Sequence, residues 1–173
     1  MVKEDNDNKY LRIMIKDTSI TEMPEDLPFH AITDKDGTKL EVTRMDYMFY
    51  NCSSLTSINL SSFDTSSVTR MDYMFYNFSS LASINLSSFN TSNVFNFRYM
   101  FYGCSNLTSL DLSSFDASLV IKMNYEYYLS NMFNECTKLY SITFIEPVFL
   151  LLYGFPVYTE WTCDGITMDY GWQ

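Results

Sequence analysis

The stretch from Val42 to Ser67 reads VTRMDYMFYNCSSLTSINLSSFDTSS, and it decides the fold. Nearly the same text returns from Val68 and from Val94, and it returns once more from Val120 with an insertion. The step is 26 residues each time, and a fixed period of this length is typical of stacked repeat architectures. Each repeat is then one supersecondary unit that buries its apolar side only against its neighbours. We therefore expect an α/β solenoid that winds as a right-handed superhelix.

Each repeat combines a helical pattern with a strand pattern, as the repeat that begins at Val68 illustrates. Apolar residues recur at positions i, i+3, i+4 and i+7 from Met71 to Phe78, which predicts a short helix. Ile84 and Leu86 then alternate with polar residues, which predicts a short strand with one apolar side. We expect a parallel sheet on one face of the solenoid and short helices on the other. Equivalent apolar residues should stack in columns, such as Leu55, Leu81, Leu107 and Leu139.

The chain divides into the repeats and two flanking caps. Residues 42–144 hold four repeats, the fourth with a six-residue insertion at Glu126–Asn131. Because an open solenoid exposes unpaired strand edges at both ends, we assign residues 1–41 to an N-terminal cap and residues 145–173 to a C-terminal cap. Within the first cap, Tyr10–Ile15 alternates like a strand, and Asp34–Gly37 is a hairpin turn signal.

Composition and charge exclude several classes of protein. Hydrophobic residues make up 47% of the chain and charged residues 18%, which is typical of an ordered protein. The net charge is −10 and most acids lie outside the repeats, so we expect neither nucleic acid nor an anionic membrane as a partner. The longest apolar run, Val148–Val157, is too short to span a membrane. The N-terminus carries no signal peptide, which leaves both an exported mature fragment and a cytoplasmic protein open.

The sequence contains no catalytic constellation, so we expect no enzyme activity, no cofactor and no metal. His30 is the only histidine, and no carboxylate partner for a catalytic dyad is identifiable. The five glycines form no phosphate-binding motif. Cys52, Cys104 and Cys136 share one repeat position, but Phe78 occupies it in the second repeat. That position therefore indicates buried apolar side chains rather than metal ligands or disulfides.

Two surfaces of the predicted solenoid are candidates for binding. The first, the strand face, consists of polar strand positions with hydroxyl and amide groups: Ser57, Asn59, Ser83, Asn85, Ser109 and Asp111. Two interpretations of this face are open. It binds a ligand, or its short polar side chains are simply suited to exposure to solvent.

The second surface, the tyrosine face, consists of tyrosines outside the apolar stripe of the predicted helices: Tyr47, Tyr50, Tyr73, Tyr76, Tyr99 and Tyr102. Tyrosine and arginine anchor many protein interfaces, and Arg44 and Arg70 lie alongside in the sequence. Exposed aromatic patches usually mark contact with a partner. The alternative is a ladder in which each ring packs on the ring of the next repeat.

The strand segment L-x-x-[IL]-x-L-x-x-F matches the leucine-rich-repeat frame, with Phe in place of Asn or Cys. The whole unit, M-x-x-M-F-x-x-C-S-x-L-x-S-[IL]-[ND]-L-S-S-F, resembles the BspA-like class of bacterial leucine-rich repeats over about 103 residues. The chain departs from that pattern at Phe78, at Phe97 and at the insertion. The resemblance implies a surface-exposed or secreted protein for adhesion and protein recognition, with an unidentified protein partner. A carbohydrate-binding module that uses the tyrosine face to hold a glycan, and a purely structural spacer, are the alternatives.

Overall fold

The computed structural model describes residues 2–5, 8–13, 15–23, 37, 41–122, 130–144, 160–163 and 166–169. His30, the hairpin signal before Gly37, the inserted residues 126–129 and the cap residues 145–159 lie outside this part of the chain. The elements in chain order are β1 (Val2–Asp5), β2 (Asn8–Ile13), β3 (Val42–Arg44), β4 (Ser109–Leu112), α1 (Ser118–Lys122), β5 (Ser141–Phe144), β6 (Glu160–Cys163) and β7 (Ile166–Asp169).

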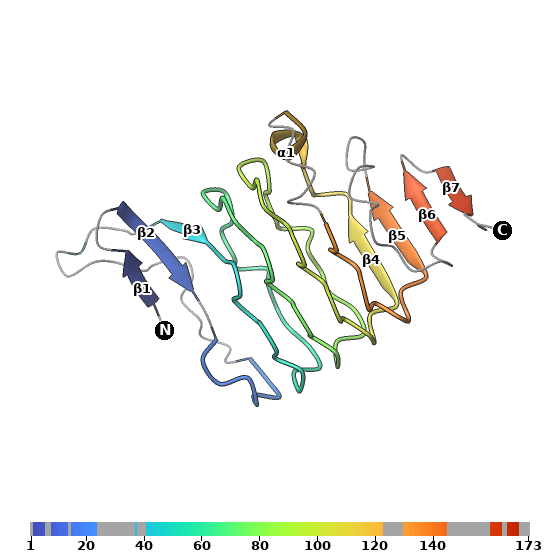
Figure 1. Ribbon diagram of the computed structural model, residues 1–173, viewed down its shortest axis with the longest axis horizontal. Helices are drawn as coiled ribbons and strands as arrows, with labels where there is room; N and C mark the ends of the chain where they lie inside the picture. The colour runs from blue at the N-terminus through green and yellow to red at the C-terminus, as the bar shows by residue number, and fades with distance from the viewer. Residues whose placement is uncertain are drawn as a thin grey trace.

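Two sheets lie towards opposite ends of the molecule (Figure 1). At the N-terminal end, β1 pairs antiparallel with β2, and β2 runs parallel to β3. The strand expected at Tyr10–Ile15 is β2, which begins at Asn8 and ends at Ile13. At the C-terminal end, β4, β5 and β6 are parallel neighbours, and β7 pairs antiparallel with β6.

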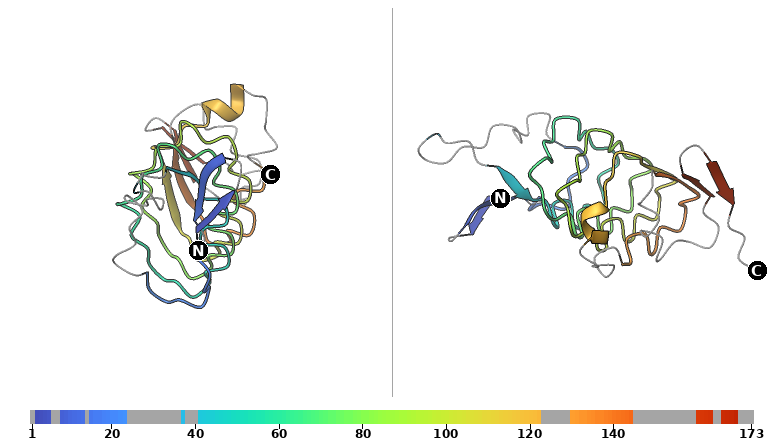
Figure 2. Two further views of the ribbon diagram at one scale, coloured as in Figure 1. Left: turned by 90° about the vertical axis from the view of Figure 1, so that its left-hand side faces the viewer. Right: turned by 90° about the horizontal axis from the view of Figure 1, so that it is seen from above.

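Between these sheets, successive repeats lie side by side along the long axis of the molecule (Figures 1 and 2). Their backbones pair in parallel with an offset of one repeat, because Arg44 bridges to Arg70 and Arg70 bridges to Asn96. In β4 and β5, Ser109 pairs with Ser141, so this pairing crosses one repeat plus the insertion. Equivalent positions of neighbouring repeats are therefore in register.

The interior of the stack is a continuous apolar cluster that runs through all four repeats. The leucine column is buried in every repeat, with exposed fractions of 0 to 3% at Leu55, Leu81, Leu107 and Leu139. Phenylalanine rings form a second column, in which Phe49 stacks on Phe75 at 5.6 Å between ring centroids and Phe75 stacks on Phe101 at 5.4 Å. In the neighbouring strand column, Ile58 and Ile84 are only partly buried, whereas Leu110 and Ile142 are buried.

The prediction of short helices opposite the strands is wrong for the described repeats, where these segments are runs of turns. Their N–H groups alternate between two kinds of acceptor. Tyr73 N donates to Arg98 O of the next repeat, whereas Met74 N donates three residues back to Met71 O. An α-helix would send every N–H four residues back. About half of the N–H groups in these segments donate to carbonyls of the neighbouring repeat. The segments are therefore hydrogen-bonded between repeats and do not form helices.

The apolar residues are spaced as in a helix, but in the structure this spacing results from a run of turns. Positive φ angles of 57° at Tyr73 and 53° at Asn77 interrupt the turns at a spacing of four residues. This geometry turns Met71, Met74 and Phe75 inward, where they are buried. Apolar residues at i, i+3 and i+4 therefore also occur in this run of turns. The periodicity of apolar residues alone does not distinguish such a run of turns from a helix.

The N-terminal segment covers the first repeat. Ile15 N donates a hydrogen bond to Met48 O, and Ile15, Ile20 and Met23 pack against the apolar cluster. Among the described residues, no helix has both the length and the apolar character needed to cross a lipid bilayer.

Candidate binding site

The six tyrosines of the tyrosine face form two files of stacked rings that run across the first three repeats. In one file, Tyr47 stacks on Tyr73 at 4.6 Å and 11°, and Tyr73 stacks on Tyr99 at 4.9 Å and 21°. The other file contains the stacked pairs Tyr50–Tyr76, at 4.9 Å, and Tyr76–Tyr102, at 4.8 Å. All six side chains are half-buried. The rings therefore cover one another's faces, as the ladder alternative expects.

The backbone at the first of these files is in a conformation that tyrosine rarely adopts. Tyr47, Tyr73 and Tyr99 have φ angles of 61°, 57° and 57°. Such a conformation costs about 1–3 kcal/mol per residue, and a stacked pair of rings returns about 0.5–1.5 kcal/mol. The inter-repeat hydrogen bonds of the same backbone, such as Tyr47 N to Asp72 O at 3.0 Å, supply further stabilisation. A tyrosine is therefore tolerated here because neighbouring repeats stack on it.

Partial burial changes the acidity of the central rings. Burial raises the pKa of Tyr73 above its ordinary value of 10.0, and the negative charge that Tyr47 gains on ionisation raises it further. Burial also raises the pKa of Tyr76, with Tyr102 as the next cause. Both phenols are therefore neutral and able to donate a hydrogen bond at neutral pH.

Ion pairs support the tyrosine face in the first two repeats. Arg70 donates two hydrogen bonds to Asp72, from Nε at 2.9 Å and from Nη2 at 2.8 Å, and Arg44 pairs with Asp46 in the same way. The side chain of Asp72 is only 4% exposed, whereas that of Arg70 is 33% exposed. The third repeat departs from this pattern, because Arg98 replaces the acid and lies over the ring of Tyr99 at 4.6 Å.

The strand-face residues Ser57, Asn59, Ser83, Asn85, Ser109 and Asp111 are exposed, as expected. The side-chain oxygens of Asn59, Asn85 and Asp111 accept hydrogen bonds in turns of the same repeat. Asn59 Oδ1 accepts from Ser61 N at 3.0 Å, and Asn85 Oδ1 accepts from Ser87 N at 3.0 Å. Asp111 Oδ1 accepts from Ser113 N at 2.9 Å. These three side chains close turns that begin at their own positions, so their first partner is the local backbone.

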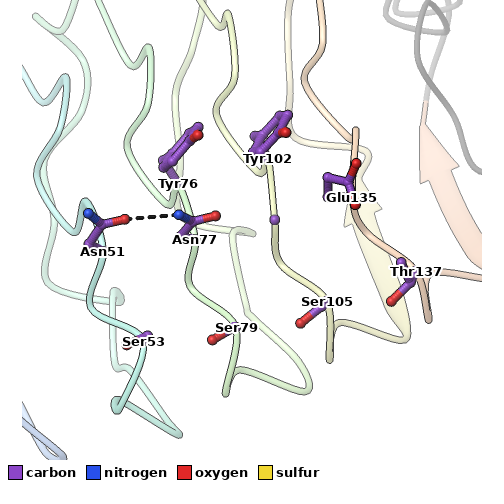
Figure 3. Close-up of a pocket in the computed structure, with 10 residues that line it drawn as sticks. Asn51, Ser53, Tyr76, Asn77, Ser79, Tyr102, Ser105, Glu135 and Thr137 are labelled. Atoms are coloured by element: carbon purple, nitrogen blue, oxygen red, sulfur yellow. Dashed lines mark hydrogen bonds between the residues drawn. The ribbon is translucent and has the colours of Figure 1, made fainter.

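A groove of about 630 Å³ runs along the tyrosine face and crosses all four repeats (Figure 3). Three rows of side chains line it. Tyr76 and Tyr102 form the upper row in Figure 3. The lower row consists of hydroxyl groups that recur once per repeat, at Ser53, Ser79, Ser105 and Thr137.

The middle row of the groove contains the second set of positive φ angles: Asn51 at 59°, Asn77 at 53°, Gly103 at 72° and Glu135 at 64°. Asn77 Nδ2 donates to Asn51 Oδ1 at 3.1 Å, so the first two repeats share an amide bridge (Figure 3). Gly103 ends the bridge, because glycine has no side-chain amide, and its lack of a Cβ leaves room for Asn77 Oδ1. That oxygen points along the groove toward the third repeat.

Of the groove residues, only Tyr76 and Tyr102 belong to the predicted site. Asn and Gly at one recurring position are the signal that could have revealed the middle row, because these residues tolerate positive φ best. Periodicity of the apolar residues contains no such signal.

The recurring cysteines are part of the core. Cys52, Cys104 and Cys136 are free and buried. Burial, followed by the charge of Asp17, raises the pKa of Cys52 to about 11, which makes this thiol a poor nucleophile. Within the described part of the chain, no cluster of three or more His, Cys, Asp or Glu side chains is arranged to hold a metal ion.

Comparison with known proteins places the repeats in one family. No curated protein and no solved structure matches the chain. One family model, described as a Mycoplasma protein of unknown function (DUF285), matches residues 29–144, which is more than half of the chain and includes all four repeats. The chain therefore belongs to the DUF285 family.

Proposed function

We propose that the chain is a right-handed leucine-rich-repeat solenoid of the BspA-like kind and a non-catalytic recognition or adhesion module, secreted or held at a cell surface. The in-register pairing of Arg44, Arg70 and Asn96 supports the solenoid. The continuous apolar cluster supports it as well, because a repeat of this size buries its apolar side only against its neighbours.

The groove on the tyrosine face is the observation that carries the recognition function. It crosses all four repeats, and its lining combines aromatic, amide and hydroxyl groups. A small number of placed polar groups orients the ligand in protein binding sites, and this open groove offers amide and hydroxyl groups in two rows. The strand face is the weaker candidate, because Asn59, Asn85 and Asp111 already accept hydrogen bonds from their own turns.

A spacer is the competing function, and a binding experiment separates the two. The purified chain should be applied to an array of purified extracellular-matrix proteins and purified glycans, and retention should be measured at increasing concentrations. We expect saturable retention on at least one arrayed molecule. If no arrayed molecule retains the chain, the recognition function is wrong and the spacer is the better explanation.

A pair of matched variants assigns the binding face. Ser79→Trp fills the groove with an indole ring, and Ser87→Trp places the same ring on the strand side of the same repeat, where Ser87 is exposed. Both positions are partly or fully exposed, so both variants should fold, and circular dichroism checks this. We expect Ser79→Trp to abolish retention and Ser87→Trp to preserve it. The opposite result would assign binding to the strand face.

A further inference from the structure

We propose that the groove binds a linear, uncharged oligosaccharide that lies along the stack and contacts the repeats in succession. This inference rests on the proposed recognition function and adds the class of ligand and the residues that hold it.

The chemistry of the lining favours an uncharged ligand rich in hydroxyl groups. The middle and lower rows offer amides and hydroxyls, which both donate and accept hydrogen bonds, as sugar hydroxyls do. Glu135 is the single formally charged residue among the described residues that line the groove. An anionic polymer would meet this carboxylate without a cation in the lining to compensate it.

The rows repeat at the spacing of the stack. Parallel neighbours lie about 4.8 Å apart, which is close to the advance of a linear glycan per pyranose ring. The hydroxyl row presents one hydroxyl per repeat, from Ser53 to Thr137. A linear oligosaccharide laid along the groove therefore meets one hydroxyl of the lower row at each step, whereas its middle-row neighbour changes from Asn51 and Asn77 to Gly103 and Glu135.

A peptide fits the groove less well, for two reasons. Peptides that bind as added strands need a free backbone edge, but here Asn51 N, Asn77 N and Gly103 N donate to the carbonyls of the next repeat. Peptides that bind through anchor side chains need apolar pockets. Phe101 and its equivalents in the other repeats are buried in the core. The groove residues themselves are polar residues, tyrosines and one glycine.

The groove tyrosines would contact the oligosaccharide through their ring edges and through one ring face. Tyr76 lies stacked between Tyr50 and Tyr102, so neither of its faces is open to a sugar. Tyr102 ends its file, because Asn134 occupies the equivalent position of the fourth repeat. Among the described residues no ring stacks on the outer face of Tyr102, and this face is where a sugar ring would pack.

Gly103 makes room for the side-chain oxygen of Asn77. It is the position at which the amide bridge from Asn51 to Asn77 stops, and it leaves Asn77 Oδ1 directed toward the third repeat. In the part of the chain that the structure describes, the hydrogen bond of the Asn77 side chain is the one that Nδ2 donates to Asn51. Asn77 Oδ1 is therefore the acceptor we assign to a sugar hydroxyl.

This assignment leads to a variant that should preserve the fold and weaken binding. Asn51 and Asn77 already adopt φ angles of 59° and 53°, so Gly103→Asn is conformationally tolerated. A Cβ at Gly103 would overlap Asn77 Oδ1, so the Asn77 side chain must first move aside. Nδ2 of the new residue would then donate to Asn77 Oδ1 and extend the bridge by one repeat. The acceptor is then lost to the ligand, and the new side chain narrows the groove.

The test is calorimetric titration of the whole chain with neutral linear oligosaccharides of glucose, mannose and N-acetylglucosamine, from monomer to hexamer, and with the anionic oligogalacturonates. At least one neutral series should bind, with affinity that rises until the oligomer spans all four repeats. Gly103→Asn should weaken this binding about tenfold or more, as expected for the loss of one hydrogen bond and added crowding. Ser87→Trp, on the strand side, should leave it unchanged.

Each other outcome overturns a distinct claim. If the array retains the chain on a protein while no neutral oligosaccharide binds, recognition stands and the oligosaccharide inference is wrong. The inference is also wrong if oligosaccharides bind but Gly103→Asn, shown by its melting temperature to be folded, binds them equally well. Tighter binding of oligogalacturonates than of every neutral series would overturn the uncharged class.

Discussion

The tyrosine face and the strand face are built from the same 26-residue unit, but their side chains bond in different directions. On the tyrosine face, rings and amides contact the equivalent residue of the next repeat, as in Tyr73 with Tyr99 and Asn77 with Asn51. On the strand face, Asn85 bonds to Ser87, two residues away in its own repeat. The side chains of the first face join neighbouring repeats, whereas the Asn85 side chain of the second face stabilises a turn of its own repeat.

This difference predicts where substitutions are costly. A change on the tyrosine face removes contacts with two neighbours at once, because each central residue lies between two repeats. A change on the strand face removes one local bond of an exposed side chain. Of the four predictions below, the first concerns an ion pair within one repeat of the tyrosine face, and the other three test that contrast.

The largest effect is expected from breaking the ion pair that supports the tyrosine face. Arg70→Met leaves the carboxylate of Asp72, 4% exposed, without its two charged hydrogen bonds. We expect a loss of about 3 kcal/mol in the free energy of unfolding, at the low end for a buried pair because Arg70 is partly exposed. Urea denaturation measures it. The double variant Arg70→Met/Asp72→Leu should lose less than the single one, and a loss below about 1 kcal/mol for the single variant would contradict the role of the pair.

Replacing a central ring should be the next most costly change. Tyr73→Ala removes the stacks with both Tyr47 and Tyr99, and we expect a loss of about 2 kcal/mol. Because φ is 57° here, Tyr73→Gly should be more stable than Tyr73→Ala by about 1 kcal/mol. Ser83 on the strand face has no positive φ, so Ser83→Ala should be more stable than Ser83→Gly. The same order of Gly and Ala at both sites would refute the backbone explanation.

Alkaline pH should weaken the stack through the same file of rings. The folded pKa values of Tyr73 and Tyr76 lie above the ordinary value of 10.0, so folding favours the neutral phenols. Their contribution to stability is complete below pH 10.0 and is lost as pH rises through the raised values. Urea midpoints measured on both sides of that pH should fall for the wild type. In Tyr73→Phe/Tyr76→Phe the fall should be smaller, and an equal fall would assign it to other groups.

The smallest effect is expected on the strand face. Asn85→Ala removes the bond from Ser87 N at 3.0 Å in an exposed turn, where water replaces the lost acceptor. We expect a loss of at most about 1 kcal/mol, measured by urea denaturation as for Arg70→Met. A loss as large as that of Tyr73→Ala would remove the distinction between the two faces.

The columns of the core were predictable because they depend only on the period. A strict repeat places Leu55, Leu81, Leu107 and Leu139 in equivalent environments, and all four are buried. The polar character of the strand face was predictable for the same reason, since alternation with Ile84 and Leu86 turns Ser83 and Asn85 outward.

The turns and the groove were not predictable from apolar spacing. The spacing of Met71, Met74 and Phe75 fits a helix, and only the positive φ of Tyr73 and the bonds to the next repeat exclude it. These bonds join residues of different repeats, so a pattern read within one repeat does not contain them. The groove was missed because its middle row is defined by backbone conformation, for which Gly103 in place of Asn was the available signal.

The register between repeats also bears on how such a chain can change over generations. Each junction reuses one set of bonds, so gene duplication of a single unit inserts a segment whose two boundaries already match their new neighbours. Under the proposed function, copy number would then set the length of polymer that the groove accommodates, without any new point substitution in its lining.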